Sequence, residues 1–487
     1  MADQRTSTDR AAAGTNNPPT EPRERIVRSD RHMTDVEALM WNVEKDPYLS
    51  STFGNVTVLD RPPDLPYFER KLLRMVERIP RLRQRVSPAL GRLAPPEWED
   101  DPDFDIRYHL RHIALPPPGE FRQLLDLATM LVHDPFDRTR PLWEFYVVEG
   151  LTGGKAAIIQ KMHHTITDGE GGIRMSEQFI DVTRELKELP LVTIEPSSES
   201  SGTNIFEAAA ETLGHTWRRG LGVAQRAALN TADALTHPAK LADLGPELVG
   251  ILRSTVRQVT VTDAAHSPLW AHRTLRRRLE TLDLDFDDAY RCAKALGGSL
   301  NDFFVTGAAR GAGRYHAKLG APVETLRMAM PISTRTDRSA GGNSFVPTRV
   351  VLPVSEADPV EHFAQIHELL NQIKQEKMLG LVEAVAGLAN LLPTSVLVRF
   401  TRQQVETVDF TTSNVRAAPF DLFIAGGLIE ANYPIGPLGG TAFNLTMMSY
   451  RGTLNMGLHV DAGAVTEPAL LRDCINEAYA ELLAAGR

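Results

Sequence analysis

A Ser-, Pro- and Thr-rich stretch, PLVTIEPSSESSGT within residues 190 to 204, divides a chain that otherwise mixes helix-like and strand-like segments. The same mixed pattern occurs on both sides of this break. The chain has 487 residues, which is more than one ordinary hydrophobic core accommodates. We therefore predict an α/β protein of the mixed type, with two domains of similar size.

The composition divides the chain further. Residues 1–30 are polar and predict a disordered tail. We expect an N-terminal domain over 31–190, a linker with helices over 191–270, and a C-terminal domain over 271–487. The last element is predicted to be a helix from Pro468 to Ala485.

Local patterns predict individual elements. Apolar residues at helical spacing indicate helices in TDVEALMWNVE, LPYFERKLLRMVERIP, EFRQLLDLATMLVHDPF and SLNDFFVTGAARGAGRYHAKLG. PLWEFYVVEGL and KAAIIQKMHH flank Gly153 and Gly154, which predicts a β-hairpin. IRMSEQFIDVTREL, which follows this hairpin, is expected to be helical.

Composition also excludes some classes of function. The net charge of −9 disfavours nucleic-acid binding. Only 2 cysteines occur, Cys292 and Cys474, which implies no disulfide framework and fits a reducing compartment. No segment reads as a membrane span or a secretory signal peptide, so we expect a cytoplasmic protein, with peripheral association at the inner membrane surface left open.

The heptapeptide HHTITDG, His163 to Gly169, is the strongest chemical signal in the chain. It follows the apolar run AAIIQKM, where a strand gives way to a loop. Because consecutive side chains of a strand point to opposite faces, His163 and His164 should not face the same cavity. A neutral imidazole can take a proton from a hydroxyl near neutral pH, Asp168 can fix a local turn, and Gly169 permits a tight backbone.

Three interpretations of the heptapeptide remain open on the residues alone. The first is a general base, and the second is a set of polar residues that merely end a strand. The third is a metal site of His164 and Asp168, which requires a helix and finds no paired-Cys or HExxH motif elsewhere. The chain also lacks a GxSxG elbow, a P-loop and a GxGxxG loop. A histidine base without a protein nucleophile suggests direct attack of a substrate hydroxyl or amine on a bound acyl donor.

Several segments together resemble a known family. HHTITDG is similar to the HHxxxDG signature of CoA-dependent acyltransferases and of peptide-synthetase condensation domains. The stretches PLWEFYVVEGL, LGGSLNDFFV, MPISTRTD with GGNSF, and SYRGTLNMGLHVD resemble those of bacterial bifunctional wax ester synthase/diacylglycerol acyltransferases. The resemblance covers the chain from about residue 32 to its end. One departure lies after Ser413, Asn414 and Val415, where Arg-Ala-Ala-Pro replaces the Pro-Gly-Pro that is usual in the family.

The resemblance implies a fold and a reaction. The fold would be two chloramphenicol-acetyltransferase-like domains with a substrate tunnel at their interface. The chain would transfer a fatty acyl group from acyl-CoA to diacylglycerol or a long-chain alcohol, without a cofactor or a metal. A glycolipid, phenolic or carrier-bound acceptor, or a catalytically silent lipid-binding role, is the alternative. The partners would be acyl-CoA, the acceptor and the surface of a membrane or lipid body in peripheral association, and no nucleic acid.

The resemblance also implies roles for particular residues. The catalytic group would be His164, which would deprotonate the acceptor, with His163 in support and Asp168 held structurally, with Arg335 as one candidate partner. The remaining implied residues are Gly169, Asn301 and Asp302 as supporting residues, and Pro141, Leu142 and Trp143 as substrate-binding residues. Packing is the alternative for these last three, and helix capping for Asn301.

A cluster of arginines, namely Arg273, Arg276, Arg277 and Arg278, could meet CoA phosphates or an anionic membrane surface. A solvated strand edge is the alternative.

Overall fold

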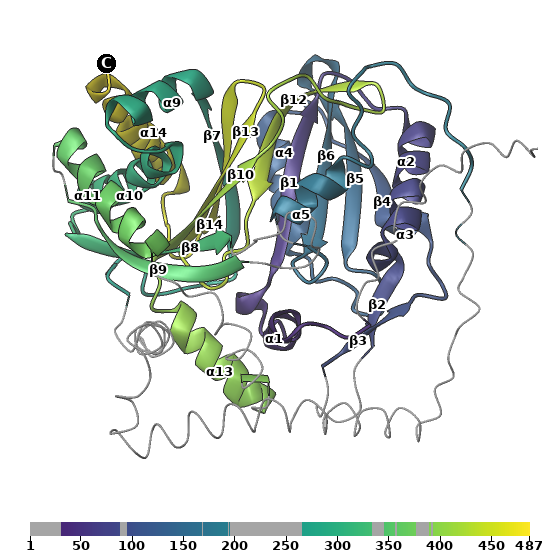
Figure 1. Cartoon of the computed structure of the whole chain (residues 1–487), viewed down its shortest axis with the longest axis horizontal. Coiled ribbons are helices and arrows are strands. Elements are labelled where there is room, and N and C mark those ends of the chain that lie inside the picture. The colour runs from purple at the N-terminus through teal and green to yellow at the C-terminus, as the bar shows by residue number, and fades with distance from the viewer. Residues whose placement is uncertain are drawn as a thin grey trace, which may run out of the picture.

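Two six-stranded mixed sheets stand side by side, each with helices packed on it (Figure 1). This computed structural model describes residues 31–87, 95–167, 169–192, 194, 265–333, 345–355, 358–375, 389–390 and 393–487. The predicted tail, most of the predicted linker and Arg335 lie outside these residues. The predicted mixed α/β class with two domain-like halves is confirmed.

The N-terminal sheet has the strand order β11-β12-β1-β6-β5-β4. Its strands are β1 (Thr52–Leu59), β4 (Leu110–Ala114), β5 (Trp143–Leu151), β6 (Lys155–His163), β11 (Phe423–Ile424) and β12 (Gly427–Ile435). The helices of this half are α1 (Asp35–Val43), α2 (Leu65–Arg78), α3 (Ile106–His109), α4 (Phe121–His133) and α5 (Gly169–Ser176). A small separate sheet pairs β2 (Gln84–Ser87) with β3 (Glu97–Asp100).

The C-terminal sheet has the strand order β7-β14-β13-β10-β8-β9. Its strands are β7 (Arg277–Asp285), β8 (Thr325–Ser333), β9 (Phe345–Pro353), β10 (Phe410–Arg416), β13 (Phe443–Tyr450) and β14 (Thr453–Asp461). Its helices are α9 (Phe286–Ala295), α10 (Leu300–Lys318), α11 (Pro359–Gln375), α13 (Thr394–Val405) and α14 (Pro468–Ala485). The predicted C-terminal helix is therefore confirmed with its bounds.

The predicted hairpin is formed by β5 and β6, which pair antiparallel through Trp143 and Met162 at one end and Leu151 and Lys155 at the other. Gly153 turns the chain between them with a φ of 80°, a left-handed conformation that glycine adopts without a steric penalty. This hairpin brings the start of HHTITDG to the end of a central strand.

The helix predicted over IRMSEQFIDVTREL is wrong in both its start and its extent. Helix α5 already begins at Gly169 and ends at Ser176. Beyond it, the backbone of Asp181 exchanges two hydrogen bonds with Phe423 of β11, at 2.7 and 2.8 Å. Pairing with a distant strand thus overrides the helical spacing of apolar residues in this segment.

Strand β12 ties the two halves together, which the sequence pattern did not predict. It lies far along the chain, yet it pairs antiparallel with β1 from Gly54 opposite Ile435 onward. It also packs closely on β14, where a Cβ at Gly457 would lie 1.9 Å from the carbonyl oxygen of Pro434. Glycine at this position lets the two sheets meet, and the region between them can become a shared site.

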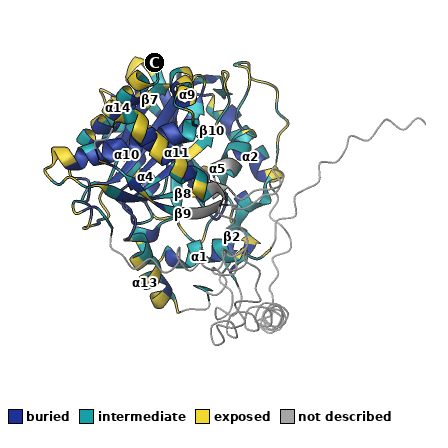
Figure 2. Ribbon diagram, turned by 60° about the vertical axis from the view of Figure 1, so that its left-hand side comes forward, coloured by how far each residue is buried: buried dark blue, intermediate teal, exposed yellow. Residues whose placement is uncertain are grey.

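Helix α10 is buried on nearly all sides within the C-terminal half (Figure 2). Its small residues make this possible, because a Cβ at Gly307 would lie 2.1 Å from the Tyr479 ring and one at Gly311 would lie 2.5 Å from Ile475. Both partners belong to α14. Close packing of these two helices forms the centre of the C-terminal hydrophobic core.

Candidate functional site

The end of β6 separates the two histidines, as the alternation of a strand predicts. Lys161 and His163 are buried, with exposed fractions of 1% each. Met162 and His164 point to the other side, where both line a large cavity. His164 itself lies in a turn and not in a helix, so the helical geometry that the metal interpretation required is missing at this residue.

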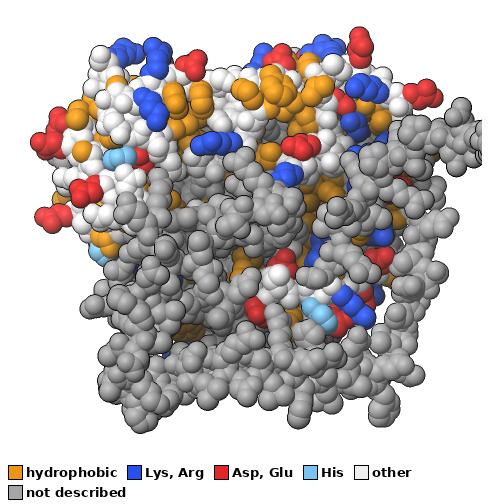
Figure 3. Space-filling view, viewed as in Figure 1, with side chains coloured by type: hydrophobic (Ala, Val, Ile, Leu, Met, Phe, Trp, Pro, Cys, Tyr) orange, Lys and Arg blue, Asp and Glu red, His pale blue; other side chains and the backbone are white. Residues whose placement is uncertain are grey.

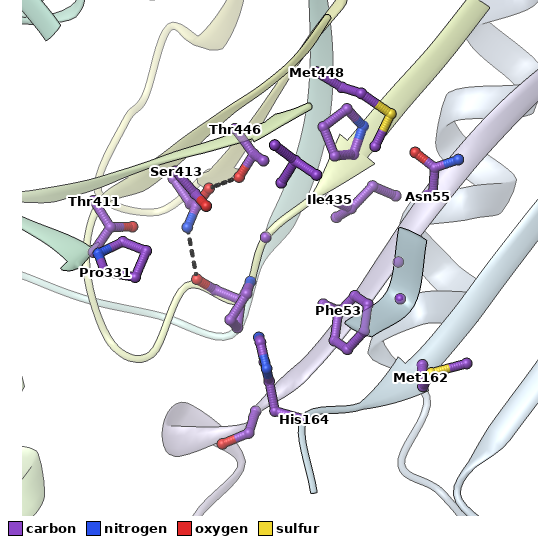
Figure 4. A pocket seen from close by; sticks show the side chains of 18 of the residues that line it. Phe53, Asn55, Met162, His164, Pro331, Thr411, Ser413, Ile435, Thr446 and Met448 are labelled. Carbon is purple, nitrogen blue, oxygen red and sulfur yellow. Dashed lines mark hydrogen bonds between the residues drawn. The ribbon is translucent and has the colours of Figure 1, made fainter. Parts of the chain in front are cut away.

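The cavity lies where the two halves of the chain meet and has a volume of about 1060 Å³. The N-terminal half contributes Phe53, Asn55 and His164, and the C-terminal half contributes Ser413, Thr446 and Met448 among others (Figure 4). On β1, the lining side chains follow one face of the strand from Phe53 through Asn55 to Thr57. Together with Ser51 they span on the order of 20 Å, a length that suits an extended chain.

The His164 ring lies against Phe53, with 4.6 Å between the ring centroids and an angle of 45° between the planes. Its backbone N–H donates to the carbonyl oxygen of Ser51 at 3.2 Å. Figure 4 shows the His164 ring directed into the cavity beside Phe53. The imidazole is therefore placed where it can meet a bound molecule.

His163 is held on the opposite side of the strand. Its Nε2 is hydrogen-bonded to Glu44, and its Nδ1 accepts from the N–H of Thr165 at 3.1 Å. Burial raises the pKa of Glu44, but the hydrogen bonds from His163 and Ser50 and the positive charge of Arg138 outweigh it, so the pKa lies below its usual value. Glu44 is thus a carboxylate that stays charged beside the motif.

The cavity wall contributed by the C-terminal half is fixed by its own polar side chains. Thr446 donates to Asn444 Oδ1 at 2.6 Å, and Asn444 Nδ2 donates to the carbonyl oxygen of Pro437 at 3.1 Å (Figure 4). A Cβ at Gly436 would lie 2.4 Å from Asn444 Oδ1, so this position has no space for a side chain. The loop after β12 is thereby held against β13.

Two arginines also line the cavity. Arg349 of β9 donates to Gln404 Oε1 at 3.0 Å. Burial, followed by the positive charge of Arg327, lowers the pKa of Arg349. Arg416 stands in the stretch where the sequence departs from the family pattern, so the departure adds a positive side chain to the lining.

Pro141, Leu142 and Trp143, which were expected to bind substrate, lie away from this cavity. All three are buried and none lines the cavity. Trp143 stacks on His109 with 4.4 Å between ring centroids and donates to the carbonyl oxygen of Leu82 at 2.7 Å. Their position next to His163 means that they support the strand end through packing.

Asn301 and Asp302 lie at the start of α10 and do not line the cavity either. Ser299, not Asn301, caps the helix, and the Asp302 carboxylate accepts from the N–H of Ser299 at 2.8 Å in return. Asp302 is fully buried and also contacts His367 Nδ1 at 2.7 Å. These contacts of Asp302 suit a role in stabilising the C-terminal half, outside the cavity that His164 lines.

The remaining predicted residues of the motif are placed only in part. Gly169 is the first residue of α5. Asp168 lies outside the described residues, and its predicted structural role stays a prediction. Within the described part of the chain, no three His, Cys, Asp or Glu side chains converge in a way that could hold a metal ion.

Three of the four arginines of the cluster contact other groups of the fold through their side chains. Arg273 is 8% exposed, and burial lowers its pKa to about 10. Arg277 lies 3.7 Å from Asp461, and Arg278 donates to Glu280 at 2.6 Å. Arg276 is exposed. Among these arginines, Arg277 links β7 to the end of β14, and Arg278 pairs within β7 itself.

Glu44 is the residue of this site that sequence reasoning missed. It is the C-cap of α1, where the negative end of the helix dipole repels a carboxylate. This unfavourable position could have drawn attention to Glu44 in the sequence, because a charge that destabilises its own helix requires a stabilising partner elsewhere. The partner, His163, lies 119 positions away in the chain and could not be inferred from local pattern.

The arrangement of two mixed α/β halves is shared with solved structures of an acyltransferase and of a condensation domain. The wax ester synthase/diacylglycerol acyltransferase from Marinobacter aquaeolei VT8 superposes with a TM-score of 0.64 at 19% identity, covering 94% of this chain and 100% of that one. The first condensation domain of the calcium-dependent antibiotic synthetase gives 0.59 at 15% identity, covering 93% and 97%. These likenesses establish the fold.

Sequence comparison identifies the family. Residues 33–304 match the wax ester synthase/diacylglycerol acyltransferase catalytic domain, and residues 341–483 match the C-terminal domain of the same family. A Mycobacterium tuberculosis protein, provisionally named a diacylglycerol O-acyltransferase, is 32% identical over 451 residues, which are 92% of this chain and 91% of that protein. The chain belongs to the wax ester synthase/diacylglycerol acyltransferase family.

Proposed function

We propose that the protein transfers a fatty acyl group from acyl-CoA to diacylglycerol or a long-chain alcohol, forming triacylglycerol or a wax ester. The observation that carries this proposal is a cavity with mostly apolar walls, which His164 lines. Apolar lining occurs on α1 and α13 at one side, and on α5 and the β10–β12 region at the other. Such a site suits two reactants that both carry long hydrocarbon chains.

The chemistry needs one proton acceptor. His164 takes the proton from the acceptor hydroxyl, and the oxygen attacks the thioester carbonyl carbon of acyl-CoA. The carbon–sulfur bond breaks as the tetrahedral intermediate collapses. The imidazolium returns its proton to the thiolate, which leaves an ester and free CoA. No metal or cofactor enters this proposal.

The charged end of the donor needs a separate place. We assign it to the part of the cavity lined by Arg416, because guanidinium groups bind phosphate with charge-assisted hydrogen bonds. The acyl chain then extends along the apolar wall. The Arg416 side chain, which the family pattern usually lacks, would make donor binding more dependent on salt.

We further propose that the protein works in the cytoplasm at the surface of a membrane or lipid body. The described residues contain no helix that is both long and apolar enough to cross a bilayer. Val182 and Phe420 line the cavity and are 64% and 54% exposed, so apolar side chains reach both the cavity and the surface, where lipid could enter. Figure 3 shows hydrophobic side chains between basic ones along the upper part of one face.

The test is release of free thiol from palmitoyl-CoA, with and without hexadecanol or dipalmitoylglycerol. Thiol release that depends on the acceptor, with ester detected by mass spectrometry, supports the proposal. Release that depends only on a phenolic, glycolipid or carrier-bound acceptor would identify the alternative enzyme. Binding of palmitoyl-CoA without release under any of these conditions would identify a lipid-binding protein and overturn the proposal.

A further inference from the structure

The carboxylate of Glu44 lies behind the turn that carries His164. One of its oxygens, Oε2, is hydrogen-bonded to His163 Nε2. The other oxygen, Oε1, accepts from the Ser50 hydroxyl at 2.6 Å, from the Ser51 N–H at 3.3 Å and from the Thr52 hydroxyl at 3.5 Å. A single side chain therefore joins the end of α1, the start of β1 and the end of β6.

The first connection to the turn runs through His163. Its Nδ1 accepts from both the N–H and the hydroxyl of Thr165, at 3.1 and 2.7 Å. An Nδ1 that accepts carries no proton, so the proton of this imidazole is on Nε2, where it is donated to Glu44. Glu44 thus selects the tautomer of His163 that holds the residue after His164.

The second connection runs through the backbone of Ser51, immediately before β1. Glu44 fixes the N–H of Ser51, and the carbonyl oxygen of Ser51 accepts from the N–H of His164 at 3.2 Å. Residues 163, 164 and 165 are therefore all attached to one carboxylate, directly or through one intermediate group. With its backbone fixed in this way and its ring against Phe53, the His164 side chain has little freedom in the cavity.

The charge of Glu44 has a counterpart. Arg138 donates to the carbonyl oxygen of Trp41 at 2.6 Å, and its guanidinium lies 3.5 Å from the centre of the Trp41 ring. Burial lowers the pKa of Arg138, and the charge of Glu44 opposes this effect. A positive group held on α1 thus helps to keep the carboxylate ionised in its partly buried position.

A glutamate bonded to a histidine could also be a catalytic dyad, with His163 as the base. The geometry argues against this assignment. His163 is 1% exposed and does not line the cavity, and its second nitrogen is occupied by Thr165. It has no path to a substrate proton. The same hydrogen bonds suit a supporting structure that orients His164.

We propose that Glu44 is the positioning residue of this active site, which fixes the orientation of His164 through His163 and Ser51. The inference rests on the proposed function, because it assigns His164 as the base. It places part of the catalytic machinery on α1, more than 100 residues before the motif in the chain. A misplaced base loses rate while the substrate still binds.

The experiment compares Glu44→Gln, Glu44→Ala and His163→Ala with the unmodified protein, using palmitoyl-CoA and hexadecanol. Glu44→Ala should lower kcat by about 10- to 100-fold, with KM for palmitoyl-CoA within about twofold. Glu44→Gln should lose less, since its amide oxygen can still accept one of the hydrogen bonds. The double variant Glu44→Ala/His163→Ala should lose no more than the worse single variant, because both residues act on the same turn.

The matched control is Glu280→Gln. This carboxylate is also shielded from solvent and accepts from Arg122, Arg278 and Arg472, but it lies away from the cavity. The control should lower the melting temperature while kcat per folded molecule stays unchanged. In the Glu44 variants, the acid limb of the pH–kcat profile should keep its midpoint, because the base itself is the same. A shifted midpoint would mean that Glu44 tunes the basicity of His164, and would overturn a purely positioning role.

Imidazole ¹⁵N NMR gives a readout that does not depend on turnover. In Glu44→Ala, the His163 resonances should show loss of the single Nε2–H tautomer, and the His164 resonances should broaden. If the unmodified protein transfers no acyl group, the proposed function fails, while these spectra still decide the positioning of His164. Wild-type kcat in Glu44→Ala, strictly additive losses in the double variant, or unchanged spectra would each overturn the inference.

Discussion

At the scale of single residues, the wall opposite the histidines is as constrained as the turn itself. Gly436 has no room for a Cβ, because Asn444 Oδ1 and Thr446 Oγ1 lie 2.4 and 2.6 Å from where it would be. Gly436→Ala should shift the loop after β12 and lower kcat/KM by roughly 10- to 100-fold, and it should also lower the melting temperature because the added Cβ overpacks the loop against β13. Steady-state kinetics beside a thermal melt check this. Unchanged kcat/KM would mean that the loop does not shape the reacting site.

Sequence reasoning reached some of these residues and missed others for physical reasons. Strand alternation places His163 and His164 on opposite sides, and the structure has this arrangement. Glu44 was missed because its partner His163 lies 119 positions away in the chain. Gly436 was missed because its constraint arises only when the loop after β12 packs on Asn444 and Thr446 of β13. A tryptophan such as Trp143 can either contact a substrate or pack in a hydrophobic core. Only the tertiary structure, in which Trp143 is buried away from the cavity, distinguishes these two roles.

At the scale of elements, the start of α10 is expected to act in folding and not in chemistry. Asp302→Ala removes an acceptor for the Ser299 N–H and for His367. The free energy of unfolding should fall by about 1–3 kcal/mol, since two partly buried donors lose the buried carboxylate that accepts from them. Specific activity per folded molecule should remain near that of the unmodified protein.

The measurement is a denaturant titration together with kinetics corrected for the folded fraction. Asn301→Ala is the neighbouring control, because Asn301 makes no part of the capping box and should affect stability less. A large loss of kcat in folded Asp302→Ala would restore the catalytic support that the family resemblance implied.

Helices and strands with strong periodicity were predictable from the sequence, and α10, α14 and the β5–β6 hairpin are examples. The elements that were predicted wrongly or missed depend on contacts between segments far apart in the sequence. The segment after α5 gives up a helical pattern to pair with β11, and β12 joins a sheet built mostly from residues more than 250 positions earlier. Local propensity cannot report such pairings.

At the scale of the whole molecule, buried histidines make stability depend on pH. Burial lowers the pKa of His109 and of His133 from 6.5 to about 4 each, and the pKa values of His316, His362 and His459 are also lowered by burial. The unfolded chain therefore binds more protons than the folded one between about pH 6.5 and 4. Stability should fall as the pH falls through this window, with His109 contributing roughly 3 kcal/mol.

Melting temperatures measured from pH 7.5 to 4 test this dependence. His109→Gln removes the titrating ring that lies between Phe104 and Trp143, so its melting temperature should change less steeply with pH than that of the unmodified protein. Glu44 acts in the same direction at lower pH, because its lowered pKa contributes stability that is lost as the pH falls through the folded value. Equal slopes for His109→Gln and the unmodified protein would contradict the assignment.

The central claim is that His164, and not His163, is the base that acts on the acceptor. The most direct measurement is ester formation from palmitoyl-CoA and hexadecanol by His164→Ala and His163→Ala, beside palmitoyl-CoA binding by calorimetry. His164→Ala should lose about 10²–10⁴-fold in rate with donor binding nearly intact, and His163→Ala should lose clearly less. Equal losses in the two variants, or a His164→Ala protein that forms ester at the normal rate, would contradict the account.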